Sequence, residues 1–218
     1  AMLWVIEISK IFEKKTENTN KTEKIYKNVR IILRLHAKQD KIYCIQENNR
    51  GYIMEKIYET AYAKINLGLD VLGKRSDGYH EVRMVMQSVG LSDAVEIEEG
   101  EGLVVETDHS GLAGGPDNLA WKAAELLARC CGKIPNVHIR LNKKIFLAAG
   151  LAGGSSDAAA VMRGLSRLWQ LDLTAPELEK LAAELGSDIP FCITGGTALA
   201  EGRGEILTEL PEAPELLL

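Results

Sequence analysis

The sequence predicts a domain of strands and helices, preceded by a segment of a different kind. Between residues 57 and 106, apolar and polar residues alternate in several places, as they do in half-buried strands. After residue 117, apolar residues instead recur at three- and four-residue intervals, which is typical of amphipathic helices. A change of composition near Met54 separates these elements from the first 53 residues.

The composition indicates a globular protein with a hydrophobic core. The 218 residues are 46% hydrophobic and 26% charged, as in folded domains. The net charge of −5 argues against a general nucleic-acid-binding protein, and no apolar run reaches the length of a membrane span. The four cysteines lack metal-site spacing and no signal-peptide pattern is present, so we expect reduced thiols and a cytoplasmic location.

Residues 1–53 differ sharply from the rest of the chain. They contain 11 basic and 6 acidic residues, against 15 basic and 25 acidic residues after them. We therefore expect residues 1–53 to be an extension outside the fold, with Met54 as the candidate start of the protein. The alternative is a basic arm with one amphipathic helix, formed by Ile25, Val29, Ile32 and Leu33.

Individual elements can be predicted after Met54. In the first strand, Leu67, Leu69 and Val71 alternate with polar residues, so Lys64 and Asn66 project from the face opposite the apolar one. A capping box at residues 174–177 predicts the start of a helix. Further strands are predicted at residues 80–90, 94–98, 103–106, 137–141, 191–200 and 205–207, and a helix at residues 118–131.

A glycine-rich loop at residues 148–157, here called the glycine loop, is the most informative stretch. It reads Ala-Ala-Gly-Leu-Ala-Gly-Gly-Ser-Ser-Asp, and glycine lets the backbone approach a ligand closely. The apolar stripe from Ala158 to Trp169 predicts a helix directly after it, whose first turn offers unpaired N–H groups to an anion. The loop matches neither the Walker A nor the Rossmann motif, so on its own it is either a phosphate site or a tight structural turn.

Two further residues complete a set that phosphoryl transfer requires. Lys64 is a cation on a strand, and Asp188 is a carboxylate in a turn before Ile-Pro. Transfer to a hydroxyl needs groups that hold the phosphates, a carboxylate that accepts the proton and a cation that offsets transition-state charge. Each residue alone is more often structural, and it is their joint order along the chain that favours a kinase.

The sequence resembles the GHMP small-molecule kinases. The motifs that carry the resemblance are Ala63-Lys64-Ile65-Asn66-Leu67, Asp77-Gly78-Tyr79-His80, Pro116-Asp117-Asn118-Leu119, residues 150–159 and residues 185–191. It implies an α+β fold of the ribosomal protein S5 domain 2-like type, the GHMP-kinase N-terminal domain, at residues 54–200. Residues 201–218 would then begin a second domain, which is truncated here.

The motifs Lys-x-Asn and Asp-Gly-Tyr-His resemble one branch of this family, which phosphorylates a cytidyl-diphosphate-linked alcohol in non-mevalonate isoprenoid biosynthesis. The resemblance implies that Asp188 is the general base and that Lys64 beside it keeps it ionised. It implies that Asn66 binds the substrate, and that Tyr79 and His80 form the cytidine pocket.

The resemblance also implies ATP as the phosphate donor, with Mg²⁺. The nucleotide-binding residues that it implies are Asn118, Lys143, Lys144, Gly150, Leu151, Ala152, Gly153, Gly154, Ser155 and Ser156. No cluster of carboxylates in the sequence defines the Mg²⁺ ligands. The family usually has proline at the position of Phe146, so the approach to the glycine loop is less rigid here.

Two other functions remain open at this point. One is a sibling GHMP kinase for another small alcohol, against which Asp77-Gly78-Tyr79-His80 argues. The other is a nucleotide-binding fragment without turnover, because the chain stops before the family's third glycine-rich motif. We expect a small-molecule partner and neither a nucleic acid nor a membrane, and the oligomeric state is left open.

Overall fold

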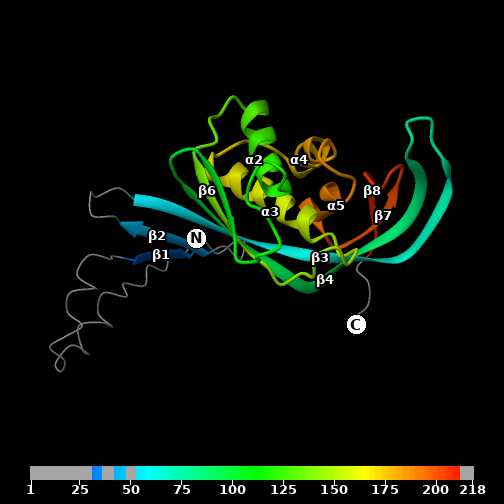
Figure 1. Cartoon of the computed structure of the whole chain (residues 1–218), viewed down its shortest axis with the longest axis horizontal. Helices are drawn as coiled ribbons and strands as arrows, with labels where there is room; N and C mark the ends of the chain where they lie inside the picture. Colours follow the sequence, from blue (N-terminus) through cyan, green and yellow to red (C-terminus); the bar gives the residue numbers. More distant parts are fainter. Residues whose placement is uncertain (1–30, 36–41, 48–52, 212–218) are drawn as a thin grey trace, which may run out of the picture.

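One mixed sheet with helices on one face forms the described part of the chain (Figure 1). The computed structural model describes residues 31–35, 42–47 and 53–211. The strands follow the order β1-β2-β3-β4-β6-β5. In addition, β7 pairs with β4, and β8 pairs with β7. Strands and helices are thus combined as the predicted α+β class requires.

The bounds of the elements are as follows. The strands are β1 (Ile31–Leu35), β2 (Ile42–Glu47), β3 (Ile53–Lys74), β4 (His80–Glu99), β5 (Leu103–Thr107), β6 (Val137–Asn142), β7 (Thr197–Glu201) and β8 (Ile206–Glu209). The helices are α2 (Leu119–Cys130), α3 (Gly153–Leu168), α4 (Ala175–Ala182) and α5 (Ile189–Thr194).

Strand β4 supports two separate groups of strands. Its residues 94–99 pair with β6, which in turn pairs in parallel with β5, whereas its residues 84–87 pair with β7. On its other edge, β4 pairs with β3 along almost its whole length. The distal part of this long antiparallel pair extends beyond the helices as an arm, here defined as residues 66–83 (Figure 1).

Helix α3 lies at the centre of the main core, between the sheet and α2 (Figure 1). A Cβ atom at Gly164 would lie 2.4 Å from Cδ1 of Ile97 and 3.5 Å from Cγ2 of Ile57. Glycine at this position therefore lets the helix approach the sheet closely. The fully buried aliphatic residues of this core include Val95, Ile97, Val137, Ile139, Val161, Met162, Leu165 and Ile189.

Several predicted elements are confirmed. Residues 103–107 and 137–142 are strands, the predicted helix at residues 118–131 is α2, and the capping box at Thr174 begins α4. The strands predicted at residues 80–90 and 94–98 form one continuous strand, β4.

The strand predicted at residues 191–200 is wrong over its first half. Residues Ile189–Thr194 form the short helix α5, and only Thr197–Glu201 form a strand. Pro190 fits the first turn of a helix, where its missing N–H has no partner to lose. Gly195, with φ of 73°, ends the helix.

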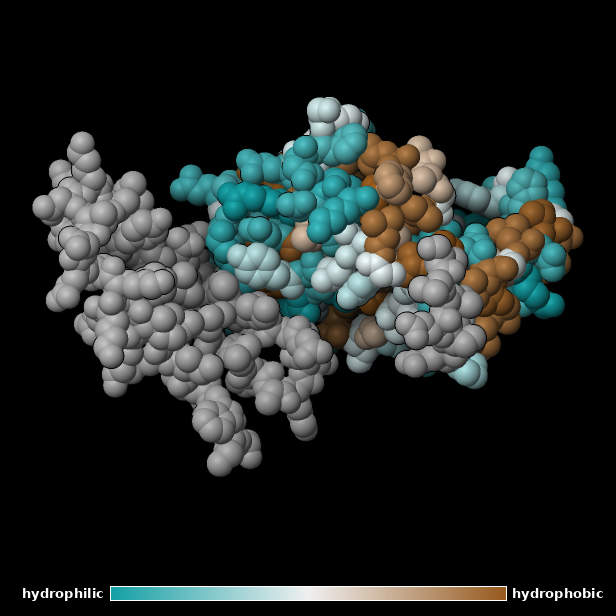
Figure 2. Space-filling model, turned by 90° about the horizontal axis from the view of Figure 1, so that it is seen from below, coloured by the Kyte–Doolittle hydropathy of each residue, from teal (hydrophilic) through white to brown (hydrophobic). Residues whose placement is uncertain are grey.

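The apolar residues of the arm are not part of the core. Leu67, Leu69 and Val71 are 46%, 49% and 59% exposed, although their alternation is that of a half-buried strand. Figure 2 shows hydrophobic side chains gathered at the end of the molecule where the arm lies. Alternation predicts the strand itself but does not tell what covers its apolar face.

The segment before Met54 contributes two described strands. β1 pairs with β2, and β2 pairs with the first residues of β3, from Ile53 to Lys56. Ile32 and Leu33 therefore lie in a strand, and the alternative helix through these residues is wrong here. Residues 1–30, 36–41 and 48–52 lie outside the described residues, and the domain boundary at Met54 stays a prediction.

Candidate active site

Lys64 and Asp188 come from distant parts of the chain and lie in contact. Nζ of Lys64 is 3.2 Å from Oδ2 of Asp188 and donates to Oδ1 of Asn66 at 3.3 Å. The Lys64 side chain is 6% exposed, whereas that of Asp188 is 32% exposed. A ligand can therefore reach this carboxylate, and such access is the first requirement for a general base.

Local structure keeps the Asp188 carboxylate available. Asp188 is the N-cap residue of α5, but its side chain accepts no capping hydrogen bond from that helix. In the described part of the chain, the Asp188 carboxylate instead forms an ion pair with Lys64 on β3. The pair is therefore formed where the start of α5 meets the middle of β3.

The glycine loop has an unusual backbone that suits an anion. Ala148, Gly150 and Ala152 have φ of 55°, 76° and 57°, and the residues between them do not have positive φ. Left-handed residues of this kind occur in the loops whose successive N–H groups form anion-binding concavities. Two of these residues are alanines, for which the conformation costs about 1–3 kcal/mol each and is typically retained at functional sites.

Hydrogen bonds fix the glycine loop beside Lys64, the partner of Asp188. The backbone N–H of Lys64 donates to the carbonyl of Leu151 at 3.1 Å, and the hydroxyl of Ser156 donates to the carbonyl of Tyr62. Since Ser156 is 2% exposed, its side chain is committed to β3. The prediction that Ser156 binds phosphate is therefore corrected: its hydroxyl is structural, while the half-buried Ser155 beside it stays a candidate.

Lys143 does not line the nucleotide site as predicted. Its Nζ is 2.5 Å from Oδ2 of Asp93 and also contacts Asp157, and its side chain is 1% exposed. A Cβ atom at Gly153 would lie 3.6 Å from this Nζ, so the ammonium group lies directly under the first turn of α3. We call Asp93, Lys143 and Asp157 the buried ion cluster, and it supports the glycine loop from beneath.

The two carboxylates of the buried ion cluster were missed by sequence reasoning. Asp93 also accepts hydrogen bonds from the backbone N–H groups of Lys144 and Ile145, which holds the chain leading to the glycine loop. Burial raises the pKa of Asp157 from 3.8 to about 7, although Lys143 opposes the shift. Asp157 stands inside the glycine-rich motif, but nothing in its spacing indicates that it is buried.

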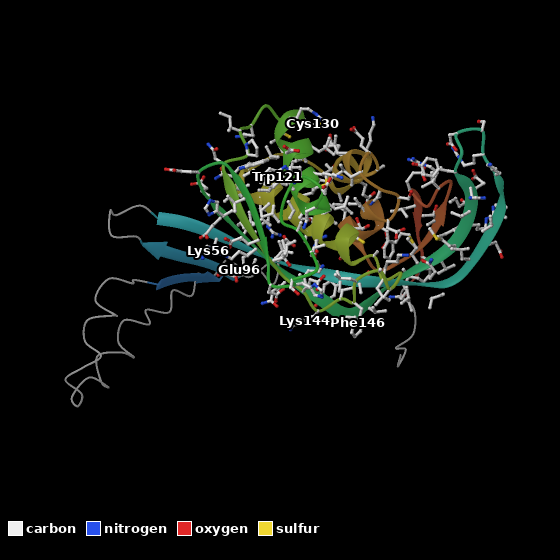
Figure 3. The ribbon with its side chains drawn as sticks, in the orientation of Figure 1. Lys56, Glu96, Trp121, Cys130, Lys144 and Phe146 are labelled. Atoms are coloured by element: carbon white, nitrogen blue, oxygen red, sulfur yellow. The ribbon has the colours of Figure 1, made fainter. Side chains whose placement is uncertain are left out.

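The other two side chains predicted to bind the nucleotide are Asn118, which caps a helix, and Lys144, which is exposed. Asn118 caps α2, because its Oδ1 accepts from the N–H of Ala120 at 2.9 Å and its Nδ2 donates to the carbonyl of Ala113 at 2.8 Å. These hydrogen bonds hold the side chain between α2 and the loop before it, and its nucleotide contact stays a prediction. Lys144 is exposed and lies near Phe146 on the segment before the glycine loop (Figure 3).

Tyr79 and His80 are exposed on the arm, where a ligand can reach them. The guanidinium of Arg203 lies 5.0 Å from the centroid of the Tyr79 ring, a cation–π contact. A Cβ atom at Gly204 would lie 3.6 Å from Cβ of Ser187, so the turn between β7 and β8 connects the arm to the neighbour of Asp188. From the sequence alone, Arg203 has no assigned role and lies between two predicted strands.

No ready metal centre is found in residues 31–35, 42–47 and 53–211. Within these ranges, no three His, Cys, Asp or Glu side chains are placed to hold a metal ion together. Over the same part of the chain, no helix combines the length and the apolar character needed to cross a bilayer. Cys130, Cys131 and Cys192 are free thiols, and burial together with the nearby Asp188 raises the pKa of Cys192 to about 12.

The comparisons with known proteins agree with this geometry. Residues 118–196 match the family model described as GHMP kinases N terminal domain. A protein of Caldanaerobacter subterraneus subsp. tengcongensis, named 4-diphosphocytidyl-2-C-methyl-D-erythritol kinase, is 50% identical over 163 residues, which are 75% of this chain and 57% of that protein. A protein of the same name from Synechococcus sp. (strain JA-3-3Ab) is 54% identical over 153 residues, which are 70% of this chain and 50% of that protein.

Solved structures show the same relationship. The crystal structure of 4-(cytidine 5'-diphospho)-2C-methyl-D-erythritol kinase is similar with a TM-score of 0.61 and 39% identity, over 71% of this chain and 55% of that one. A mevalonate kinase with a TM-score of 0.55 and 14% identity, over 71% of this chain and 56% of that one, shares the fold alone. The chain spans about half the length of the relatives that it matches. On this combined evidence, the chain carries a GHMP kinase N-terminal domain, which the family model matches over residues 118–196.

Proposed function

We propose that the protein transfers the γ-phosphoryl group of ATP to the 2-hydroxyl of 4-diphosphocytidyl-2-C-methyl-D-erythritol, a step of the non-mevalonate isoprenoid pathway. The observation that carries this proposal is the ion pair of Lys64 and Asp188 beside the glycine loop. The relatives that bear this kinase name, at 50% and 54% identity, support the choice of substrate.

The chemistry follows from the positions of these groups. Asp188 accepts the proton of the substrate hydroxyl as its oxygen forms a bond to the γ-phosphorus, and the bond from that phosphorus to the bridging oxygen of ADP breaks. Lys64 offsets the negative charge that gathers around the reacting oxygens. Backbone N–H groups of the glycine loop and the positive end of α3 hold the phosphates.

Nucleotide and substrate contacts are assigned within this proposal. Gly150, Leu151, Ala152, Gly153 and Gly154 contact the phosphates through their backbone, with Ser155 contributing its hydroxyl. Lys144 lies towards the adenosine. Asn66, Tyr79 and His80 bind the cytidyl substrate, and the exposed ring of Tyr79 with Arg203 over it supports a stacking site for a base.

We further propose that Mg²⁺ accompanies ATP. Mg²⁺ usually keeps several waters and is held by nucleotide phosphates with one or two protein oxygens. The described residues suit that mode, because Ser155 lies in the glycine loop and Asp188 pairs with Lys64, whose N–H is bonded to that loop. When bound, the ion would neutralise part of the phosphate charge.

A coupled assay for ADP release tests the proposed function. The chain is incubated with ATP and the cytidyl substrate, and with homoserine and mevalonate as small-alcohol controls. We expect turnover with the cytidyl substrate alone. Turnover with another alcohol would identify a sibling kinase, and tight ATP binding without any turnover would identify a nucleotide-binding fragment.

The location of the protein is a separate proposal. We place it in the cytoplasm, where thiols remain reduced, because the described cysteines form no disulfide with one another. Cell fractionation followed by detection of the protein tests this proposal, and recovery outside the cytoplasmic fraction would contradict it.

A further inference from the structure

Arg163, in the middle of α3, joins the two elements that carry Lys64 and Asp188. Its Nη1 donates to the carbonyls of Cys192 at 2.6 Å and Ile193 at 3.3 Å in α5, and its Nη2 donates to the carbonyl of Thr60 in β3 at 2.9 Å. Its Nε lies 3.1 Å from Oε2 of Glu59. One planar guanidinium therefore fixes α5 against β3, as the fork geometry of arginine allows.

The carbonyls that Arg163 binds lie at the end of α5 opposite to Asp188. Because α5 has only six residues, it is about 9 Å long, at 1.5 Å per residue. A short rigid helix that is fixed at its last turn is also fixed at its first residue. The Asp188 carboxylate is therefore located by the contacts that Arg163 makes at the far end of the helix.

Helix α3 and the glycine loop also determine where Lys64 lies. Along β3, the carbonyl of Thr60 accepts from Arg163, the carbonyl of Tyr62 accepts from Ser156, and the N–H of Lys64 donates to Leu151. Alternate residues on this edge of β3 are thus bonded to α3 or to the glycine loop before it. Helix α3, which begins in the glycine loop, is therefore bonded both to the strand that carries Lys64 and to the helix that begins after Asp188.

We propose that Arg163 is a positioning residue that sets the contact between Lys64 and Asp188. It reaches the pair only through β3 and α5, and acts by keeping these two elements at a fixed separation. In catalysis, a displacement of a reacting group by about 1 Å lowers the rate by ~100-fold. The kinetic part of this inference rests on the proposed kinase function, whereas the contact itself can be measured without activity.

The test compares Arg163→Lys with Arg140→Lys as a matched control. Lysine retains the charge at position 163 but lacks the planar fork that binds carbonyls on two elements. Arg140 also forms several ion pairs, with Glu98 and Glu106, but lies in β6 with its side chain 47% exposed. All three proteins are treated with an amine-reactive N-hydroxysuccinimide ester below their melting temperatures. Mass spectrometry then measures the rate at which Lys64 is acylated.

We expect Lys64 to be acylated several-fold faster in Arg163→Lys than in the parent or in Arg140→Lys. We also expect kcat to fall by about 10- to 100-fold in Arg163→Lys, with KM for ATP nearly unchanged, since the glycine loop stays in place. A role limited to stability would lower the melting temperature without exposing Lys64 in the folded protein.

Three outcomes decide against the inference or separate it from the proposed function. Unchanged acylation of Lys64 in Arg163→Lys overturns it, whatever happens to kcat. Unfolding of Arg163→Lys while Arg140→Lys stays folded also overturns it, because Arg163 would then be a requirement of the whole fold. A parent chain without turnover contradicts the proposed kinase function, while the acylation rates still decide the role of Arg163.

Discussion

At the scale of single residues, the carboxylates of this protein have unlike surroundings. Asp188 is partly exposed and meets one buried ammonium group, whereas Asp157 is 2% exposed and shares Lys143 with Asp93. The first arrangement leaves a carboxylate that a ligand can contact. The second uses a carboxylate to hold a loop. Two predictions follow these different roles.

Asp188→Asn should abolish phosphoryl transfer and leave nucleotide binding nearly unchanged. The amide keeps the shape of the carboxylate but cannot accept the hydroxyl proton, and loss of a general base lowers the rate by ~10² to 10⁴. Turnover and ATP affinity are measured in parallel, with the exposed Asp172 changed to Asn as a control. Activity within a few-fold of the parent would remove Asp188 from this role.

Asp157 should make stability depend on pH. Its pKa is raised by burial to about 7 in the folded state from an ordinary 3.8, so the folded state binds the proton more tightly than the unfolded state. The stabilising contribution of the protonated carboxyl is present below about pH 4 and is lost as the pH rises through about 7.

The measurement compares melting temperatures of the parent and Asp157→Asn from pH 5 to pH 8. Asparagine keeps the shape without a titrating proton, so the variant should gain stability relative to the parent as the pH rises. A difference in melting temperature that is constant over this range would show that Asp157 stays ionised throughout, paired with Lys143.

At the scale of elements, packing around the loop before α2 is unusually tight at one residue. A Cβ atom at Gly114 would lie 1.9 Å from the carbonyl oxygen of Val105 in β5, while nothing lies within 4 Å of the Cβ position of Gly115. Of these two neighbouring glycines, only Gly114 lies against the backbone of β5. The pair offers a matched comparison.

Gly114→Ala should lower the free energy of unfolding by about 1–3 kcal/mol, because backbone atoms must move to admit the methyl group. Gly115→Ala should change it by less than about 0.5 kcal/mol. Chemical denaturation of both variants measures the difference. Equal destabilisation of the two would mean that the loop adjusts freely and that its contact with β5 is weak.

The elements also show what the sequence can and cannot predict. Residue chemistry and order were enough to predict Lys64, Asp188 and the glycine loop as one site, because phosphoryl transfer needs those parts. The burial of Lys143 was not predictable, since a lysine beside another lysine gives no indication of which one turns inward. The short apolar run that contains α5 was assigned to a strand, because periodicity does not separate a buried strand from a short buried helix.

At the scale of the whole molecule, the sheet is longer than the helical layer that covers it (Figure 1). Leu67, Leu69, Val71 and Leu72 on the arm are each about half exposed or more. Apolar residues of this kind are costly to leave in water. The other end of β3 receives β2, from the segment that composition sets apart.

Removal of residues 1–53 should leave the remaining domain folded. The described contact of this segment with the rest is the pairing of β2 with the start of β3, at Met54 to Lys56. We expect a loss of less than about 1 kcal/mol, or a fall in melting temperature of less than about 4 °C. A markedly larger fall, measured by calorimetry, would show that the segment is part of the fold.

The bonds between α3 and the edge of β3 have a consequence for amide hydrogen exchange. The Lys64 N–H donates a hydrogen bond to the carbonyl of Leu151. It therefore exchanges with solvent only when the glycine loop separates from the strand. Its exchange rate therefore reports the opening of the loop at a single, identifiable proton. A nucleotide that binds the loop should slow this exchange in proportion to occupancy, which gives a measure of ligand binding that needs neither turnover nor a label.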